Sequence, residues 1–193
     1  MLPMSLHRDA VAFYGLALEA EDLMLIERYV RAAVLAAFAS LEAQLNMVAQ
    51  AHANAHRHAI DPLVHDVLLE LEATIDEQGH IVRRRRRIPL TTRLCFLTGF
   101  VSGREFPRNG QLWQRFLRAT ALRDSYVHPK PPFPWDYSPS LARDVIDTIT
   151  DVEIEVHRLM GLEPMHWWMP TDELLRRDRA RILGLPEPER GSG

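Results

Sequence analysis

The chain lacks the features that mark secreted, disulfide-stabilised or membrane-spanning proteins. Its only cysteine is Cys95, so no internal disulfide can form, and a reducing cytoplasm fits. The N-terminus has no basic and then apolar run of the kind that a signal peptide shows. The most apolar stretches, around residues 32–41 and 94–101, are too short to cross a bilayer. We therefore expect a soluble cytoplasmic protein that makes no membrane contact.

Positive charge is not in excess either, since the net charge is −3 and Lys130 is the only lysine. This balance argues against a protein that coats nucleic acid with its whole surface. With 193 residues, 47% of them apolar and 25% charged, the chain has the size and composition of one globular domain with a real core. No internal repeat or linker divides it, so residues 1–193 are expected to form a single domain.

Apolar residues at helical spacing are what the sequence has in quantity. From residue 20 to about residue 53 they recur every three or four positions, and no proline or glycine interrupts them. Similar stripes, opened by capping residues or by a first-turn proline, predict further helices. The expected helices cover residues 8–19, 20–53, 61–73, 91–101, 109–127 and 138–160, with a last basic helix from Thr171. The expected caps are Asp61, Thr91 or Thr92, Ser138 and Thr171.

The stretch from residue 74 to residue 89 has a different character. Asp76-Glu77-Gln78-Gly79 is typical of a turn, with Thr74-Ile75 before it and Ile81-Val82 after it, which predicts a small β-hairpin or an extended loop. The whole pattern predicts an all-α fold, a bundle of four to five main helices over about residues 20–161. A C-terminal extension with a short helix (162–183) and a disordered tail (184–193) follow.

One cation stands where a helix should be apolar. On a helical wheel of residues 109–127, Arg123 falls at the centre of the apolar face. That face is formed by Leu112, Trp113, Phe116, Ala119, Thr120 and Val127. Arginine has no neutral form available, so this position costs several kcal/mol unless the charge is paired or solvated. His128 follows five residues later, where Pro129 should stop the helix. A fixed cation and an imidazole held close together can act on a phosphate.

Two interpretations of this pair stay open. In the simpler one, Arg123 forms an intramolecular salt bridge and His128 is a cation favoured by the helix dipole. In the other, both side chains serve one site. On a straight helix they point roughly 140° apart. A shared site therefore needs either two antiparallel copies of the helix or a local unwinding before Pro129.

The sequence Arg123-Asp124-Ser125-Tyr126-Val127-His128 resembles the signature of the HEPN superfamily (higher eukaryotes and prokaryotes nucleotide-binding). That signature is an arginine, usually a polar residue, then a few residues and a histidine at the end of a bundle helix. Residues 36–46, AAFASLEAQLN, are similar to an early long helix of several prokaryotic HEPN-like families. The order of the helices agrees as well, and the resemblance covers about residues 21–161.

The resemblance implies a HEPN-like helical bundle that forms a homodimer, with both motifs facing a shared cleft. It implies a metal-independent endoribonuclease of a toxin or antiviral defence system, with an antitoxin or a nucleotidyltransferase as its partner. Arg123 and His128 would be the catalytic pair and Asp124 the polar orienting residue. His128 would move the proton and Arg123 would stabilise charge while the RNA 2′-hydroxyl attacks the adjacent phosphorus. One alternative is a catalytically silent HEPN-like dimer that binds a nucleotide or a partner protein. The other is an unrelated scaffold with Arg123 in an internal ion pair.

Other clusters of charged and aromatic residues are candidates for binding. Five consecutive arginines are candidate RNA contacts, together with Lys130, although such a run is often only a solvated surface. The run consists of Arg83, Arg84, Arg85, Arg86 and Arg87. His52 and His56 have a spacing that zinc enzymes use, but no third ligand is evident, so we expect no metal and no cofactor. The segment His166-Trp167-Trp168 is expected to pack the C-terminal extension against the bundle.

Overall fold

The computed structural model describes residues 2–128, 137–163 and 168–182, and nearly all of its elements are helices. The all-α prediction is therefore confirmed. The elements are α1 (Leu2–Glu19), α2 (Leu23–Ala55), α3 (Pro62–Leu68), β1 (Leu71–Ile75), β2 (Ile81–Arg85), α4 (Leu90–Ser102), α5 (Gln111–Val127), α6 (Pro139–Leu159) and α7 (Thr171–Ile182).

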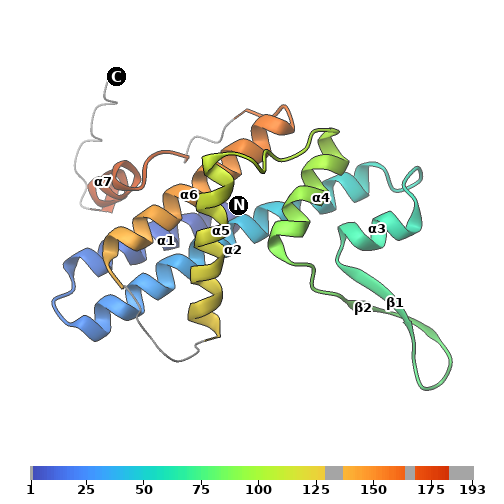
Figure 1. Cartoon of the computed structure of the whole chain (residues 1–193), viewed down its shortest axis with the longest axis horizontal. Helices are drawn as coiled ribbons and strands as arrows, with labels where there is room; N and C mark the ends of the chain where they lie inside the picture. Colours follow the sequence, from blue (N-terminus) through green and yellow to red (C-terminus); the bar gives the residue numbers. More distant parts are fainter. Residues whose placement is uncertain (1, 129–136, 164–167, 183–193) are drawn as a thin grey trace.

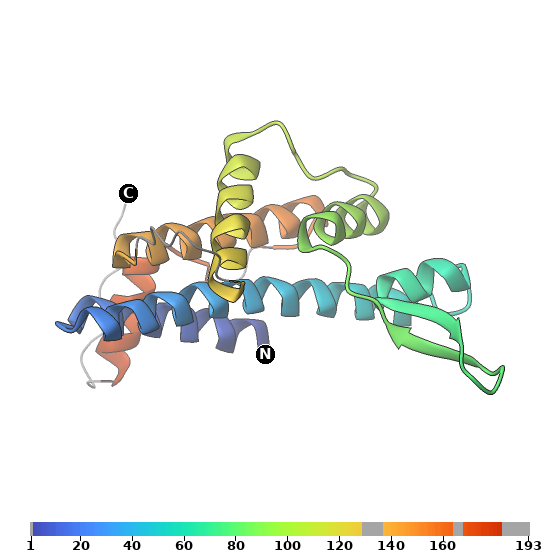
Figure 2. The same cartoon turned by 60° about the horizontal axis from the view of Figure 1, so that its bottom comes forward.

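The body of the molecule is built on α2, the longest helix. α1 folds back along its first half, α6 packs along it, and α5 crosses both α2 and α6 steeply (Figures 1 and 2). α4 also packs on α2, and the two-stranded hairpin projects from the same end (Figure 2). The C-terminal end of α5 comes close to the base of this hairpin, where both line one pocket.

The apolar stripe of α2 forms the centre of the core, as its spacing predicts. Val30, Val34, Phe38, Leu41 and Leu45 are all buried. α2 is also long and apolar enough to cross a membrane by length and composition, which the short apolar stretches did not suggest. Half of the most apolar 18-residue stretch of α2 is buried inside the structure. The core helix of a soluble protein meets the same criteria of length and composition.

The core reaches further toward the N-terminus than expected. α1 begins at Leu2 rather than near Arg8, and its residues Ala10, Val11, Tyr14 and Ala17 are buried. The bundle therefore includes residues before residue 20. The apolar pattern in residues 2–7 is too short to predict this first turn. Pro3 is compatible with it, because a helix tolerates proline in its first turn.

The predicted hairpin is confirmed, but the helix before it is shorter than predicted. α3 begins at the Asp61 cap, whose carboxylate accepts from the Leu63 N–H at 2.7 Å, and it ends at Leu68 instead of Ala73. Glu70 follows with a φ of 53°, in the left-handed region, which prevents the helix from continuing. Residues 71–75 then pair with 81–85 in an antiparallel register.

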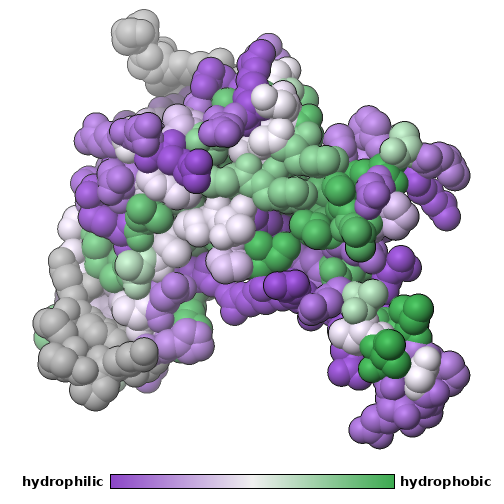
Figure 3. Space-filling view, turned by 45° about the vertical axis from the view of Figure 1, so that its right-hand side comes forward, coloured by the Kyte–Doolittle hydropathy of each residue, from purple (hydrophilic) through white to green (hydrophobic). Residues whose placement is uncertain are grey.

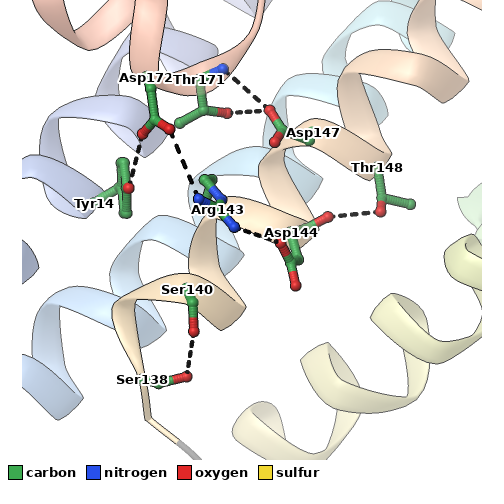
Figure 4. Close-up of polar contacts among 9 residues, drawn as sticks. All are labelled: Tyr14, Ser138, Ser140, Arg143, Asp144, Asp147, Thr148, Thr171 and Asp172. Atoms are coloured by element: carbon green, nitrogen blue, oxygen red, sulfur yellow. Dashed lines mark hydrogen bonds and ion pairs between the residues drawn. The ribbon is translucent and has the colours of Figure 1, made fainter.

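The predicted caps of two other helices are wrong. The N-cap of α4 is Pro89 and not Thr91 or Thr92, and α7 starts at Thr171 itself. The N–H and the hydroxyl of Thr171 both donate to the Asp147 carboxylate of α6, at 3.1 and 2.6 Å (Figure 4).

α7 is fastened to the body by polar contacts as well as by packing. The Tyr14 hydroxyl of α1 donates to Asp172 at 2.9 Å, and Arg143 of α6 lies 3.7 Å from the same carboxylate (Figure 4). Gly15 leaves room for Leu175, because a Cβ there would lie 2.8 Å from its side chain. Of the aromatic segment, Trp168 joins the extension to α6 as predicted, while His166, Trp167 and the tail 184–193 lie outside the described residues.

Two ionisable side chains are buried in the body. Glu153 of α6 accepts hydrogen bonds from the Ser40 hydroxyl and the Trp168 indole N–H, both at 2.7 Å. Burial nevertheless raises the pKa of this carboxyl to about 7. His7 of α1 is fully buried, and neither ring nitrogen has a hydrogen-bond partner among the described residues. Burial lowers its pKa to about 4.

These two residues give opposite pH dependences of stability. Glu153 keeps its proton up to about pH 7 in the folded chain, whereas it loses the proton near pH 4.5 in the unfolded chain. The stabilisation that comes from this difference is therefore present below pH 4.5 and is lost as the pH rises to about 7. For His7 the stability is present above 6.5 and is lost as the pH falls toward about 4. Between these two pH values, the contribution of Glu153 to the free energy of unfolding changes by about 3 kcal/mol.

We predict that Glu153→Gln removes the loss of stability that Glu153 causes as the pH rises. The free energy of unfolding, measured with urea between pH 4.5 and 8, should then rise more steeply with pH than in the unmodified protein. Exposed Glu21→Gln is the matched control and should leave the profile unchanged. Parallel profiles for Glu153→Gln and the unmodified protein would show that Glu153 is not protonated in the fold.

Candidate functional site

A pocket of about 670 Å³ lies at the C-terminal end of α5. It is bounded by the last turns of α5, by the segment that leaves β2 and by the start of α4. The side chains that line it are Arg87, Pro89, Leu90, Thr91, Thr120, Arg123, Asp124, Ser125, Val127 and His128. All three residues predicted as a catalytic group, together with one of the five consecutive arginines, therefore line the same pocket.

Arg123 and His128 line the same pocket, and the backbone leaves the helical conformation at His128. α5 ends at Val127, and His128 has φ −127° and ψ 69°, outside the helical region. Its N–H still donates to the Asp124 carbonyl at 2.9 Å, so its backbone is tied to the helix end. Both residues thus line one pocket within a single chain, with a non-helical backbone at His128.

Arg123 is almost buried and is neutralised within the chain. Its side chain is 10% exposed, and its Nη1 lies 3.1 Å from Glu42 Oε1 of α2. Its Nε lies 3.8 Å from the Asp124 carboxylate, and its guanidinium carbon lies 5.3 Å from the centre of the Phe38 ring. The intramolecular salt bridge of the simpler interpretation is therefore confirmed for Arg123. A guanidinium has five N–H donors, more than these two carboxylate contacts use, so Arg123 keeps donors for a ligand.

Glu42 belongs to a longer series of charges behind the pocket. Arg93 of α4 is 6% exposed, and its Nη1 lies 3.3 Å from Glu70 Oε2. Burial lowers the pKa of Arg93, while Glu70 and then Glu42 oppose that shift. Glu42 thus acts on two buried guanidinium groups, those of Arg93 and Arg123.

Sequence reasoning missed Glu42 as a site residue. It stands four residues after Phe38, on the edge of the buried stripe of α2, and a carboxylate in that place is the available signal. Its partner could not be named from the sequence, because the partner lies on a helix that crosses α2 in the fold.

Asp124 lines the pocket with a carboxylate that is 61% exposed. At 3.8 Å from Arg123 Nε it reinforces the main ion pair with Glu42 and does not replace it. Its backbone carbonyl accepts the His128 N–H at 2.9 Å. The orienting role of the Asp124 side chain stays a prediction.

The five arginines divide into distinct roles. Arg83 Nε donates to Asp66 Oδ2 at 3.1 Å, and Arg86 Nη1 lies 3.6 Å from Glu72 Oε1. Arg87 lines the pocket. Arg84 and Arg85 are exposed on β2. Lys130, the other predicted RNA contact, lies outside the described residues.

The histidine and cysteine candidates do not form a metal site in the part of the chain that is described. No group of three or more potential ligands comes together there. His52 and His56 stack on each other with ring centres 4.2 Å apart, and burial followed by the charge of His56 lowers the pKa of His52. Cys95 is half-buried, and burial raises the pKa of its thiol, which disfavours a nucleophilic role.

Comparison with protein-family models, with curated proteins and with solved structures finds no significant match for this chain. The HEPN resemblance therefore rests on the residues quoted for it, and the function has to be argued from the pocket.

The Arg123–Glu42 pair predicts a loss of stability when either partner is removed. We expect Arg123→Ala to lower the free energy of unfolding by about 1–3 kcal/mol, because the change removes a nearly buried ion pair and the packing on Phe38. This differs from a helix that carries an unpaired cation, where the same change would stabilise the fold. Double-mutant analysis with Glu42→Ala should give a coupling energy of at least about 0.5 kcal/mol.

The matched control is Arg118→Ala on the exposed face of the same helix, which should change stability by no more than about 0.5 kcal/mol. Additive effects of Arg123→Ala and Glu42→Ala in denaturant unfolding would contradict the pairing.

Proposed function

We propose that this protein is a HEPN-like, metal-independent endoribonuclease whose active site is the pocket at the end of α5. The observation that carries the proposal is that Arg123 and His128 line one pocket, joined there by Arg87. Two guanidinium groups and an imidazole around a space of this size suit a phosphodiester.

The chemistry assigned to these residues is a transphosphorylation. The RNA 2′-oxygen attacks the adjacent phosphorus as His128 accepts its proton, the bond from phosphorus to the 5′-oxygen breaks, and the leaving 5′-oxygen takes a proton from solvent. The product is a 2′,3′-cyclic phosphate and a free 5′-hydroxyl. Arg123 and Arg87 stabilise the negative charge on the phosphoryl oxygens.

Preorganisation of Arg123 supports a catalytic role. Glu42 and the Phe38 ring fix the guanidinium before any ligand arrives, so little reorganisation accompanies the reaction. Thr120 and Ser125 also line the pocket, but their hydroxyls donate to the carbonyls of Phe116 and Leu122. The charged groups are therefore left as the main donors to a substrate.

The homodimer implied by the resemblance is part of the proposal, with the two pockets facing a shared cleft. Glu42 neutralises Arg123 within the chain, so the charge of Arg123 does not require a partner subunit. The dimer is now supported only by the resemblance and by apolar side chains that α5 exposes, Leu117 at 38% and Val127 at 45%. Light scattering at micromolar concentration tests it, and a strictly monomeric protein would contradict it.

The second candidate is a silent HEPN-like protein that binds a nucleotide or partner protein without cleavage. The pairing of Arg123 with Glu42 favours it, because an arginine with 10% exposure already has a structural task. The two candidates differ in one measurable property, the cleavage of RNA by the purified protein.

For the enzyme we predict that His128→Ala lowers the cleavage rate by about 10²–10⁴, since general acid–base catalysis contributes that much. Arg123→Lys, which keeps the charge but loses the planar fork, should also cleave more slowly, by up to about 10²–10³. Arg118→Ala and exposed His56→Ala are the matched controls and should retain full activity.

The end groups and the substrate requirements complete this test. Cleavage should continue in EDTA and should yield 2′,3′-cyclic phosphate ends, and DNA of the same sequence should stay intact. Equal cleavage of DNA, or full activity of both His128→Ala and Arg123→Lys, would contradict the mechanism. Absence of RNase activity in the unmodified protein would favour the silent candidate.

A further inference from the structure

β2 carries more positive charge than the surrounding residues neutralise. Within residues 83–87, Arg83 is paired with Asp66 and Arg86 with Glu72. No ion pair joins Arg84, Arg85 or Arg87 to any acidic residue in the described ranges. The run therefore consists of two arginines that hold the hairpin in place and three whose charge is available to a partner.

The geometry of the hairpin brings the available arginines to one edge. The sheet has only two strands, so β2 has an open side along its whole length. Arg84 and Arg85 stand on opposite faces because side chains alternate along a strand, and both are long enough to reach past the open edge. The hairpin also stands out from the body, with hydrophilic side chains along the hollow between them (Figure 3).

Backbone donors lie along the same edge. The Arg86 N–H donates to the Glu70 carbonyl across the sheet at 2.8 Å. In an antiparallel ladder the N–H groups alternate in direction, so the Arg85 N–H faces the open edge. A phosphate that lies against this edge meets the Arg85 amide between the Arg84 and Arg85 side chains.

The edge also leads into the pocket. Arg87 follows two residues after Arg85 and lines the pocket that contains Arg123 and His128. The rise of a strand puts the Arg84 and Arg87 backbones about 10 Å apart. A polyanion on the edge of β2 therefore reaches the pocket over a short distance.

We propose that the open edge of β2 binds the phosphate backbone of RNA next to the cleaved bond, through Arg84 and Arg85, and that Arg87 leads the strand into the pocket. The identity of the polyanion rests on the proposed function. The substrate is thus an RNA that extends beyond the cleaved dinucleotide by enough nucleotides to lie along β2.

The opposite side of the segment after β2 is less suited to a polyanion. A second pocket there, of about 580 Å³, shares Arg87 and Pro89 with the first but is also lined by Asp66, Glu70 and Glu72. These three carboxylates are already paired with Arg83, Arg93 and Arg86, so this side offers a phosphate backbone little unpaired positive charge besides Arg87. The edge of β2, with Arg84 and Arg85, is therefore the electrostatically favoured route.

The test is the salt dependence of binding to an RNA oligonucleotide that is 2′-O-methylated throughout and cannot be cleaved. Each phosphate contact adds about 0.7 to the slope of log K against log salt for a single strand. We expect Arg84→Ala and Arg85→Ala each to reduce the slope by about 0.7, and the double variant by about 1.4. Arg83→Ala and Arg86→Ala are matched controls, since their charges are already paired, and should leave the slope unchanged.

A cleavage assay adds a second readout. The double variant Arg84→Ala/Arg85→Ala should cleave a dinucleotide as well as the unmodified protein does, and a long RNA with a reduced kcat/KM. The proposal is overturned if unmodified protein does not bind the oligonucleotide. It is also overturned if the double variant keeps the slope of the unmodified protein, which is the result expected if Arg84 and Arg85 bind an acidic protein partner instead. Equal reductions of the slope in all four single variants would overturn it as well. The expected slopes in a protein that cleaves no RNA would uphold the binding surface and contradict only the proposed function.

Discussion

Arginine keeps its proton at any pH at which a protein folds, so a guanidinium inside a helical bundle has to be neutralised by geometry. Arg123 meets this constraint through Glu42 at 3.1 Å and the Phe38 ring, both on α2. The pair therefore sets where α5 crosses α2, and with it the position of the C-terminal end of α5. Because His128 follows at that end and lines the same pocket, the contact also fixes the region in which the two residues meet a ligand.

The charges behind the pocket connect it to the hairpin. Glu42 acts on Arg93 as well as on Arg123, and Arg93 is bound to Glu70. Glu70 also accepts hydrogen bonds from the Arg86 and Ile88 N–H groups, with its carbonyl and its carboxylate respectively. Its left-handed φ of 53° is a strained conformation for a glutamate, and it directs both groups to the base of the hairpin. The core helix, α4, α5 and the arginine strand are thus held in one arrangement around the pocket.

The parts of this arrangement that depend on local spacing could be predicted from the sequence. The buried stripe of α2 and the turn at Asp76–Gly79 are encoded within a few residues, and both are found in the structure. The end of α3 could not be placed, because the apolar residues within 69–75 suit a helix as well as a strand. The strand conformation follows from the left-handed backbone at Glu70 and from pairing with β2. Arg123 and His128 could be selected as a pair, but Glu42 and Arg93 could not be assigned to them, since those contacts join helices that are far apart in the sequence.

The central claim is that one phosphodiester is held by Arg123, Arg87 and His128 together. The most direct measurement is NMR of the arginine and histidine side chains during titration with a dinucleotide in which hydrogen replaces the 2′-hydroxyl, so that it cannot be cleaved. We expect the side-chain signals of Arg123, Arg87 and His128 to shift with a single dissociation constant, while those of Arg118 stay in place. Shifts confined to residues outside the pocket, or different dissociation constants for Arg123 and His128, would contradict the claim.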